Sequence, residues 1–182
     1  MSTTQTTAPT AATAETLPGG AIIAAIKAAG IRTIMAVPDI VSSEGLLFPI
    51  SRDPALRLIR VCKEDEAVGI SAGLAACGQR SMLLIQHTGL LDSINALRAV
   101  AVEYSIPVCL MVGLLEKEPG VAPTKSGRYG VRIVEPILDA MGIAHHLLET
   151  AADVPIVPKA IDLAYEQSKP VVLLLGRRPV AP

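Results

Sequence analysis

Apolar residues along the chain follow two patterns that alternate in order. Short apolar runs are typical of strands, whereas apolar residues spaced three or four positions apart are typical of helices packed on one face. The expected strands are 33–37, 56–62, 82–86, 107–112, 144–148 and 171–175. The expected helices are 21–29, a short one from Ser42 or Ser43 to 47, 64–77, 91–104, 131–141 and 158–167. Strands that alternate with helices predict an α/β fold, with a six-stranded, mainly parallel sheet and helices on both faces.

Glycine-rich and polar segments divide this pattern. Gly30 and Gly78 follow two of the expected helices, where glycine commonly ends a helix. The segment 116–130 is rich in Gly, Pro and Lys and is long for a connection, which indicates a functional or disordered loop. Residues 1–18 are mostly Thr, Ala, Ser and Gln, so we expect a disordered tail there without a signal peptide. Residues 19–182 are expected to form one domain.

The composition narrows the classes of function. The chain has 182 residues and a formal net charge of −1, and it contains one Phe, three Tyr and no Trp. So few aromatic rings and so little positive charge argue against nucleic-acid binding. No apolar run approaches the roughly 18–20 residues that span a bilayer, so no membrane association is expected. The mean hydropathy of +0.48 is nevertheless high, which favours an oligomer interface for the surplus apolar surface.

Several common binding signatures are missing from the chain. The cysteines Cys62, Cys77 and Cys109 are odd in number and have no CxxC spacing. Neither a disulfide framework nor a zinc site is therefore expected, and reduced thiols favour a cytoplasmic location. No GxGxxG follows the first expected strand, which argues against a dinucleotide-binding fold. The segment 120–126 resembles a P-loop, but Thr124 stands where a P-loop needs its second glycine, so no phosphate-binding loop is expected there.

An acidic cluster, Glu64-Asp65-Glu66, follows an expected strand and opens a helix rich in small residues. Acidic side chains in a first helical turn interact favourably with the helix dipole, and this alone explains at least two of the three. Successive helical residues diverge by about 100°, so at most one of them faces a given partner. Small residues allow another chain or a cofactor to approach the helix backbone closely. A carboxylate at such a contact would be desolvated and chemically useful.

Two stretches of the chain resemble a known enzyme family. Residues 63–73 resemble the glutamate-bearing helix of thiamine-diphosphate-dependent decarboxylases, and residues 86–97 resemble that family's next loop and helix. Ile106-Pro107 and the apolar strand after it continue the likeness, which runs from about 21 to 176. The likeness is strongest to the alpha subunit of sulfopyruvate decarboxylase and the matching domain of phosphonopyruvate decarboxylase. This resemblance implies the pyrimidine-binding domain of such an enzyme.

The resemblance implies roles for several residues of the chain. Glu64 corresponds to the glutamate that bonds to the aminopyrimidine ring of thiamine diphosphate and promotes its imino tautomer. Gly69 and Gly73 lie five and nine residues after it, as in the family, and this spacing selects Glu64 over Glu66. The residues expected to line the pyrimidine are Pro38, Gly89 and Leu90.

A partner chain is also implied by the resemblance. The family binds the diphosphate and a divalent metal through a Gly-Asp-Gly element on a second domain, and no Gly-Asp-Gly occurs in this chain. We therefore expect a separate beta subunit that carries this domain and the Mg²⁺, with no metal bound by this chain itself. Two alpha and two beta chains would be the smallest symmetric assembly with complete sites.

Three further residues are candidates for contact with the substrate. His87 stands where sulfopyruvate enzymes carry Asn and where benzoylformate decarboxylase-like members carry His. It could relay protons near neutral pH, or it could only hydrogen-bond the loop. Asn95 is expected to approach the substrate. Arg128 belongs to a basic stretch over 125–132 that either closes over an anionic substrate or is a solvated loop.

The expected function is therefore the alpha subunit of a two-subunit, thiamine-diphosphate-dependent decarboxylase of a small 2-oxo acid, active only with its partner chain. Two alternatives stay open. One is a carboligase subunit that uses the same cofactor to join two carbonyl compounds. The other is a non-catalytic subunit whose apolar faces only stabilise an assembly.

Overall fold

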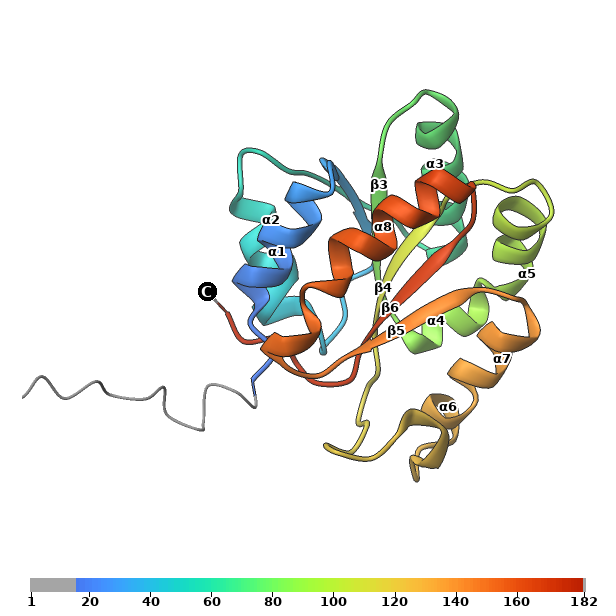
Figure 1. Cartoon of the computed structure of the whole chain (residues 1–182). Coiled ribbons are helices and arrows are strands. Elements are labelled where there is room, and N and C mark those ends of the chain that lie inside the picture. Colours follow the sequence, from blue (N-terminus) through green and yellow to red (C-terminus); the bar gives the residue numbers. More distant parts are fainter. Residues whose placement is uncertain (1–15, 182) are drawn as a thin grey trace, which may run out of the picture.

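A parallel sheet forms the centre of residues 16–181, the part of the chain that this computed structural model describes (Figure 1). Its six strands are β1 (Thr33–Ala36), β2 (Arg57–Arg60), β3 (Ser81–Gln86), β4 (Cys109–Gly113), β5 (Ala144–Leu148) and β6 (Val171–Leu175). They lie in the order β2-β1-β3-β4-β6-β5, and each neighbouring pair is parallel. The α/β class and the strands expected from the sequence are confirmed, and the sheet is wholly rather than mainly parallel.

Helices cover both faces of the sheet, as expected. On one face lie α1 (Gly19–Ala28), the π-helical turn η2 (Ser43–Leu47), α2 (Phe48–Arg52) and α8 (Ile156–Gln167). On the other face lie α3 (Glu64–Ala76), α4 (His87–Asp92), the π-helical turn η3 (Leu97–Val102), α6 (Tyr129–Arg132) and α7 (Val134–Ala140). The short elements between them are α5 (Ile94–Ala96) and the 3₁₀ turns η4 (Pro123–Lys125) and η5 (Ala151–Asp153).

The hydrophobic core has two layers because the inner strands bury both of their faces. Along β3, Met82 and Leu84 pack against the layer of α1 and α8, while Leu83 and Ile85 pack against the layer of α3 and α7. A strand covered on both faces is a continuous apolar run, which is the pattern seen in the sequence. β2 lies at an edge of the sheet and keeps the mixed exposure that its alternating sequence predicts.

Helix ends follow the expected signals in most places. Gly30 and Gly78 come directly after the caps of α1 and α3 with φ of 79° and 71°, a conformation that favours glycine. The helix expected to end at 47 continues through α2, because Pro49 falls near the start of α2, where proline is tolerated. The helix expected over 131–141 is divided at Ile133, and Pro136 lies in the first turn of its second part, α7.

The expectation of a loop at Gly89 and Leu90 is wrong, because both residues are helical. Gln86 has an extended backbone, with φ −94° and ψ 161°, and α4 begins at the next residue. Where α4 ends, the Ser93 hydroxyl donates a hydrogen bond to the Gly89 carbonyl (2.7 Å). In the sequence Gly89 suggests a turn, but its conformation is helical. Its small size instead allows the close contact with Glu64 that is described below.

The two ends of the described chain lie side by side. The Gly19 amide donates to the Val180 carbonyl (2.8 Å), and the Val180 amide donates to the Leu17 carbonyl (2.9 Å). Leu17 is 1% exposed, so it packs into the domain although it belongs to the expected tail. Residues 1–15 of that tail lie outside the described residues. Over 16–181, no helix has both the length and the apolar character needed to cross a bilayer.

Candidate active site

The carboxyl ends of the parallel strands meet at one edge of the sheet, and the main expected site residues lie there. Pro38 follows β1, and Glu64 begins α3 after β2. His87 and Gly89 lie in the first turn of α4, directly after β3. Open α/β sheets bind ligands at this edge. The fold therefore brings together residues from three separate strand ends.

Hydrogen bonds assign separate roles to the members of the acidic cluster. The Glu66 carboxylate accepts bonds from the amides of Cys62 (3.0 Å) and Lys63 (3.4 Å), and so caps the start of α3. Asp65 accepts a bond from the Glu66 amide (3.0 Å) and lies 3.7 Å from the Lys63 ammonium group at the surface. Two of the three acids therefore have local structural roles, as the helix-dipole interpretation predicts.

Glu64 is the acid of this cluster that has no structural partner. It is partly buried, and within 16–181 it forms no hydrogen bond or ion pair. Its side chain lies against Gly89 of α4, so closely that a Cβ added at Gly89 would overlap the carboxylate. Glycine is thus needed at position 89 for close approach. The Glu64 carboxylate thus lies in a space that Gly89 leaves open, here called the glycine cradle, and accepts no hydrogen bond from the described residues. Such an acceptor suits a ligand with its own N–H donors, as in an aminopyrimidine.

His87 is buried at the same edge, with 6% of its surface exposed. Its Nδ1 accepts a hydrogen bond from the Leu115 amide (3.2 Å), in the segment after β4. Gly130 lies against the other side of the ring, where a Cβ would be 2.9 Å from Nε2. Burial lowers the pKa of His87, and the nearby backbone of Gly113 opposes part of that shift. This geometry supports the alternative that His87 holds the loop, and the proton relay stays a prediction.

The turn after β1 reaches across the sheet edge to the end of β4. Asp39, which the sequence interpretation missed, shapes this turn: its carboxylate accepts bonds from the amides of Val41 (2.6 Å) and Ser42 (2.9 Å). Gly113 at the end of β4 leaves space for this turn, because a Cβ at position 113 would be 2.7 Å from the Val41 Cβ. Pro38 is exposed in the turn and lines an open depression of about 390 Å³. An Asp directly after a proline, with serines three and four residues later, is itself a turn signal.

Three expected site residues make other contacts. Leu90 is 1% exposed and packs into the core below α4, so its side chain is not free to line a cofactor. Asn95 is exposed, and its side-chain oxygen accepts bonds from the Arg98 guanidinium group (3.0 and 3.2 Å). Arg128 is exposed and pairs with Glu116 (2.9 Å). The roles of all three near a cofactor or substrate stay predictions.

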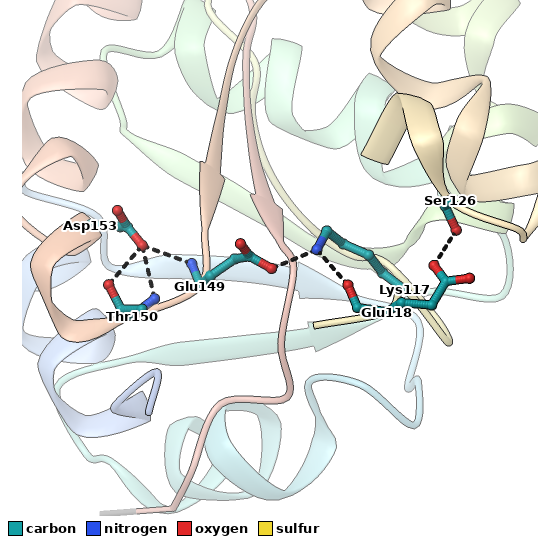
Figure 2. A network of polar contacts seen from close by, with 6 residues as sticks. All are labelled: Lys117, Glu118, Ser126, Glu149, Thr150 and Asp153. Atoms are coloured by element: carbon teal, nitrogen blue, oxygen red, sulfur yellow. Dashed lines mark hydrogen bonds and ion pairs between the residues drawn. The ribbon is translucent and has the colours of Figure 1, made fainter. Parts of the chain in front are cut away.

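The segment 114–130 is folded on itself and fixed to the sheet by polar contacts (Figure 2). The Glu118 carboxylate accepts a bond from the Ser126 hydroxyl (2.6 Å). The side chain of Lys117 is fully buried and pairs with Glu149, which follows β5 (2.5 Å). Composition and length indicated a functional or disordered loop over 116–130. A lysine whose partner lies 32 residues away leaves no local pattern in the sequence.

Small residues line the exposed face of α3. Gly69 and Gly73 are exposed, and a Cβ added at either would meet no atom within 4 Å. No close approach within the described chain requires glycine there, although glycine weakens a helix interior by about 1 kcal/mol relative to alanine. The sequence predicts that another chain approaches this helix closely. The exposed face of α3 leaves room for such a contact, which stays a prediction.

Comparison with known proteins confirms the resemblance found in the sequence. No known protein-family profile matches the chain. Over 159 residues the chain is 31% identical to the sulfopyruvate decarboxylase subunit alpha of Methanocaldococcus jannaschii, and the match covers 85% of this chain and 90% of that protein. It is 30% identical over 120 residues to the sulfopyruvate decarboxylase of Methanosarcina acetivorans, which covers 65% of this chain but 30% of that longer protein.

A solved structure has the same fold. It is a 2-oxoglutarate:ferredoxin oxidoreductase from Magnetococcus marinus, with 2-oxoglutarate, coenzyme A and succinyl-CoA bound. The two folds superpose with a TM-score of 0.67 over 87% of this chain, and the match spans 28% of the other chain. The sequence identity is 16%, so this likeness concerns the fold alone.

Proposed function

The chain belongs to the family of sulfopyruvate decarboxylase alpha subunits, and we propose on this premise that it is the pyrimidine-binding subunit of a thiamine-diphosphate-dependent decarboxylase. The substrate is a small anionic 2-oxo acid of the sulfopyruvate or phosphonopyruvate type. The reaction releases the carboxylate of this acid as carbon dioxide.

The observation that carries the proposal is the contact between Glu64 and Gly89. A carboxylate with no partner among the described residues lies over a glycine at the ligand-binding edge of the sheet. The neighbouring acids Asp65 and Glu66 are engaged by backbone amides. Glu64 is thus the acid of the cluster that is free to bond to a ligand.

The proposed site binds the pyrimidine half of the cofactor. When bound, thiamine diphosphate supplies the electron sink that decarboxylation of a 2-oxo acid requires. Glu64 shares a proton with a ring nitrogen of the aminopyrimidine and so favours its imino form. Gly89 leaves the space in which this carboxylate rests. The turn at Pro38 and the backbone of Leu90 complete the lining.

The diphosphate and Mg²⁺ belong, in this proposal, to a beta subunit. The chain lacks the Gly-Asp-Gly element that holds them in the resembled family. The exposed glycines at 69 and 73 leave α3 free for close packing with another chain. An assembly of two alpha and two beta subunits is the smallest one with two-fold symmetry and complete sites.

The first test is co-expression of the chain with the product of the neighbouring gene. The purified complex is supplied with thiamine diphosphate, Mg²⁺ and a panel of 2-oxo acids, and release of carbon dioxide is measured. We expect release from acids with a second anionic group. Mixed 2-oxo acid and aldehyde substrates, with product analysis, distinguish decarboxylation from carboligation. No release from any acid in a verified complex would contradict the proposal.

The second test is the change Glu64→Gln in the complex. It removes the proton acceptor, so we expect hydrogen–deuterium exchange at C2 of the bound cofactor, followed by NMR, to slow by about 10²–10⁴-fold. Activity should fall with it. Asp65→Asn is the matched control, because it removes an acid of the same turn that is engaged at the surface. Full activity of the Glu64→Gln complex would instead indicate a non-catalytic subunit.

A further inference from the structure

Lys117 carries a buried charge that the proposed reaction does not use. Its side chain has no exposed surface, and its Nζ donates to a Glu149 carboxylate oxygen (2.5 Å) and to the Glu118 carbonyl (3.0 Å), as Figure 2 shows. An ammonium group taken out of water is costly unless it is paired and hydrogen-bonded. The segment that carries Lys117 is therefore tied to Glu149.

Glu149 is positioned for this contact by its own surroundings. It follows β5, and β6 lies between β5 and β4 in the sheet, so its side chain crosses the end of β6 to reach Lys117. Gly176, the first residue after β6, leaves that path open, because a Cβ there would be 2.8 Å from the Glu149 Cγ. The Glu149 amide donates to the Asp153 carboxylate (2.9 Å), which fixes the backbone. The ion pair thus joins the ends of three strands.

The segment fixed in this way contacts both sides of His87. At one end of the segment the Leu115 amide donates to Nδ1, and at the other end Gly130 lies against Nε2. Between them, the bond from Ser126 to Glu118 folds the segment back on itself. A ring nitrogen that accepts a hydrogen bond carries no proton, so the neutral ring is protonated at Nε2.

We propose that Lys117 and Glu149 are positioning residues that keep His87 neutral and protonated at Nε2, so that the ring acts as a hydrogen-bond donor at the active-site edge and not as a base. This inference rests on the proposed function, since it assigns the role of His87 in the same site. A donor suits a 2-oxo acid, whose carbonyl and acid oxygens are acceptors. Without the ion pair, the Leu115 amide loses its fixed position and both tautomers of His87 are populated.

The test uses the double variant Lys117→Met/Glu149→Gln in the complex. It removes both charges together, so no unpaired ion stays buried and the fold is expected to be retained. The chain has three histidines, so ¹⁵N-histidine labelling gives few signals, and His87→Asn identifies those of His87. In the unmodified complex we expect one protonated and one unprotonated nitrogen. In the double variant we expect averaged signals, whereas Lys125→Met, at an exposed lysine of the same segment, should leave them unchanged.

Kinetics gives the second measurement. The double variant should lower kcat by about tenfold to a hundredfold, the size of effect expected from misplacing a group in a site, while the affinity for thiamine diphosphate stays unchanged. Lys117→Gln/Glu149→Gln also removes both charges but keeps two polar groups that can hydrogen-bond to each other, and it is the second variant should the first fail to fold. An unchanged His87 tautomer in the variants would overturn the inference. An inactive unmodified complex would overturn the proposed function, and the labelling result would still decide the role of Lys117 and Glu149.

Discussion

Glu64 differs from its sequence neighbours in what surrounds it rather than in its chemistry. Asp65 and Glu66 accept bonds from backbone amides at the start of α3, and such contacts are available to any acid in a first helical turn. Glu64 instead lies over Gly89 of α4. Its position therefore depends on a residue that is 25 positions away in the sequence and has no side chain.

Glycines have the same function at three places on the carboxyl edge of the sheet. In each case a side chain that follows one strand lies against a glycine at or after the end of another strand, and a Cβ at the glycine would obstruct it. The pairs are Gly89 with Glu64, Gly113 with Val41, and Gly176 with Glu149. None of these glycines has a positive φ within the described chain, so space rather than backbone conformation requires them.

The change Gly89→Ala tests this requirement directly. The backbone at 89 is helical, so alanine is tolerated there and the free energy of unfolding should change by no more than about 1 kcal/mol. The new methyl group would displace the Glu64 carboxylate, and we expect the activity of the complex to fall by about 10²-fold, as for other small misplacements in active sites. Steady-state kinetics and urea unfolding followed by circular dichroism measure the two effects.

Gly73→Ala is the matched control for the unfolding measurement alone, because Gly73 lies on the face proposed to pack against the partner chain. It adds the same methyl group to a helix at a place with no atom within 4 Å. We expect the unfolding free energy of the chain to rise by about 0.5–1 kcal/mol. Unchanged activity of Gly89→Ala would show that Glu64 tolerates displacement, and the cradle would then have no function in catalysis.

At the scale of elements, the start of α4 and the segment 114–130 form one unit around His87. The ring accepts a bond from Leu115 at the start of the segment and contacts Gly130 at its end. Burial lowers the pKa of this histidine, so the protonated form would disrupt the unit. The packing of these elements is therefore coupled to pH.

We expect stability to fall as the pH falls below the unfolded pKa of His87, near 6.5. Between that value and the lowered folded pKa, the unfolded chain binds a proton that the native chain does not, so unfolding is favoured progressively. Above 6.5 the ring is neutral in both states and has no effect, and below the folded pKa the loss levels off. Urea unfolding of the full chain at a series of pH values measures this slope.

His87→Gln should reduce this slope, because glutamine can still accept the bond from Leu115 but does not titrate. Burial also lowers the pKa of His146, so part of the slope should remain and should disappear in the double variant His87→Gln/His146→Gln. An unchanged slope in both variants would mean that neither histidine is buried in its neutral form.

The sequence allowed the elements of the fold to be predicted more reliably than the contacts between them. Strands such as 171–175 are continuous apolar runs, and burial of both faces explains why they were found with correct bounds. The start of α4 was missed because Gly89 signals a turn, whereas its small size serves Glu64. Lys117 was missed because its partner Glu149 is distant in the sequence, so its burial follows from tertiary contacts alone.

At the scale of the whole molecule, the two-layered core separates the cysteines by environment. Cys109 lies in β4 with no exposed surface, and burial raises the pKa of its thiol to about 12. Cys62 and Cys77 are exposed near the two ends of α3. A thiolate is needed for reaction with disulfide reagents, so Cys109 reacts at a useful rate only when the domain unfolds.

We therefore expect two thiols per chain to react with dithiobis(nitrobenzoate) at pH 8 in the native full-length protein, and the third after denaturation. The absorbance of the released thiolate gives the count. The variant Cys62→Ser/Cys77→Ser should show no native reaction, so its single thiol then reports global unfolding. Rapid native labelling of this variant would contradict the packing of β4 in the core.

The pairing of Leu17 and Gly19 with Val180 bears on how this domain can be linked covalently to others. β6 ends at Leu175, so the strand leads to the carboxyl edge of the sheet only a few residues before this pairing. The described chain therefore begins and ends at one place, a few residues beyond the carboxyl end of β6. Chain that joins this domain before Leu17 and chain that joins it after Val180 would thus be attached at the same place.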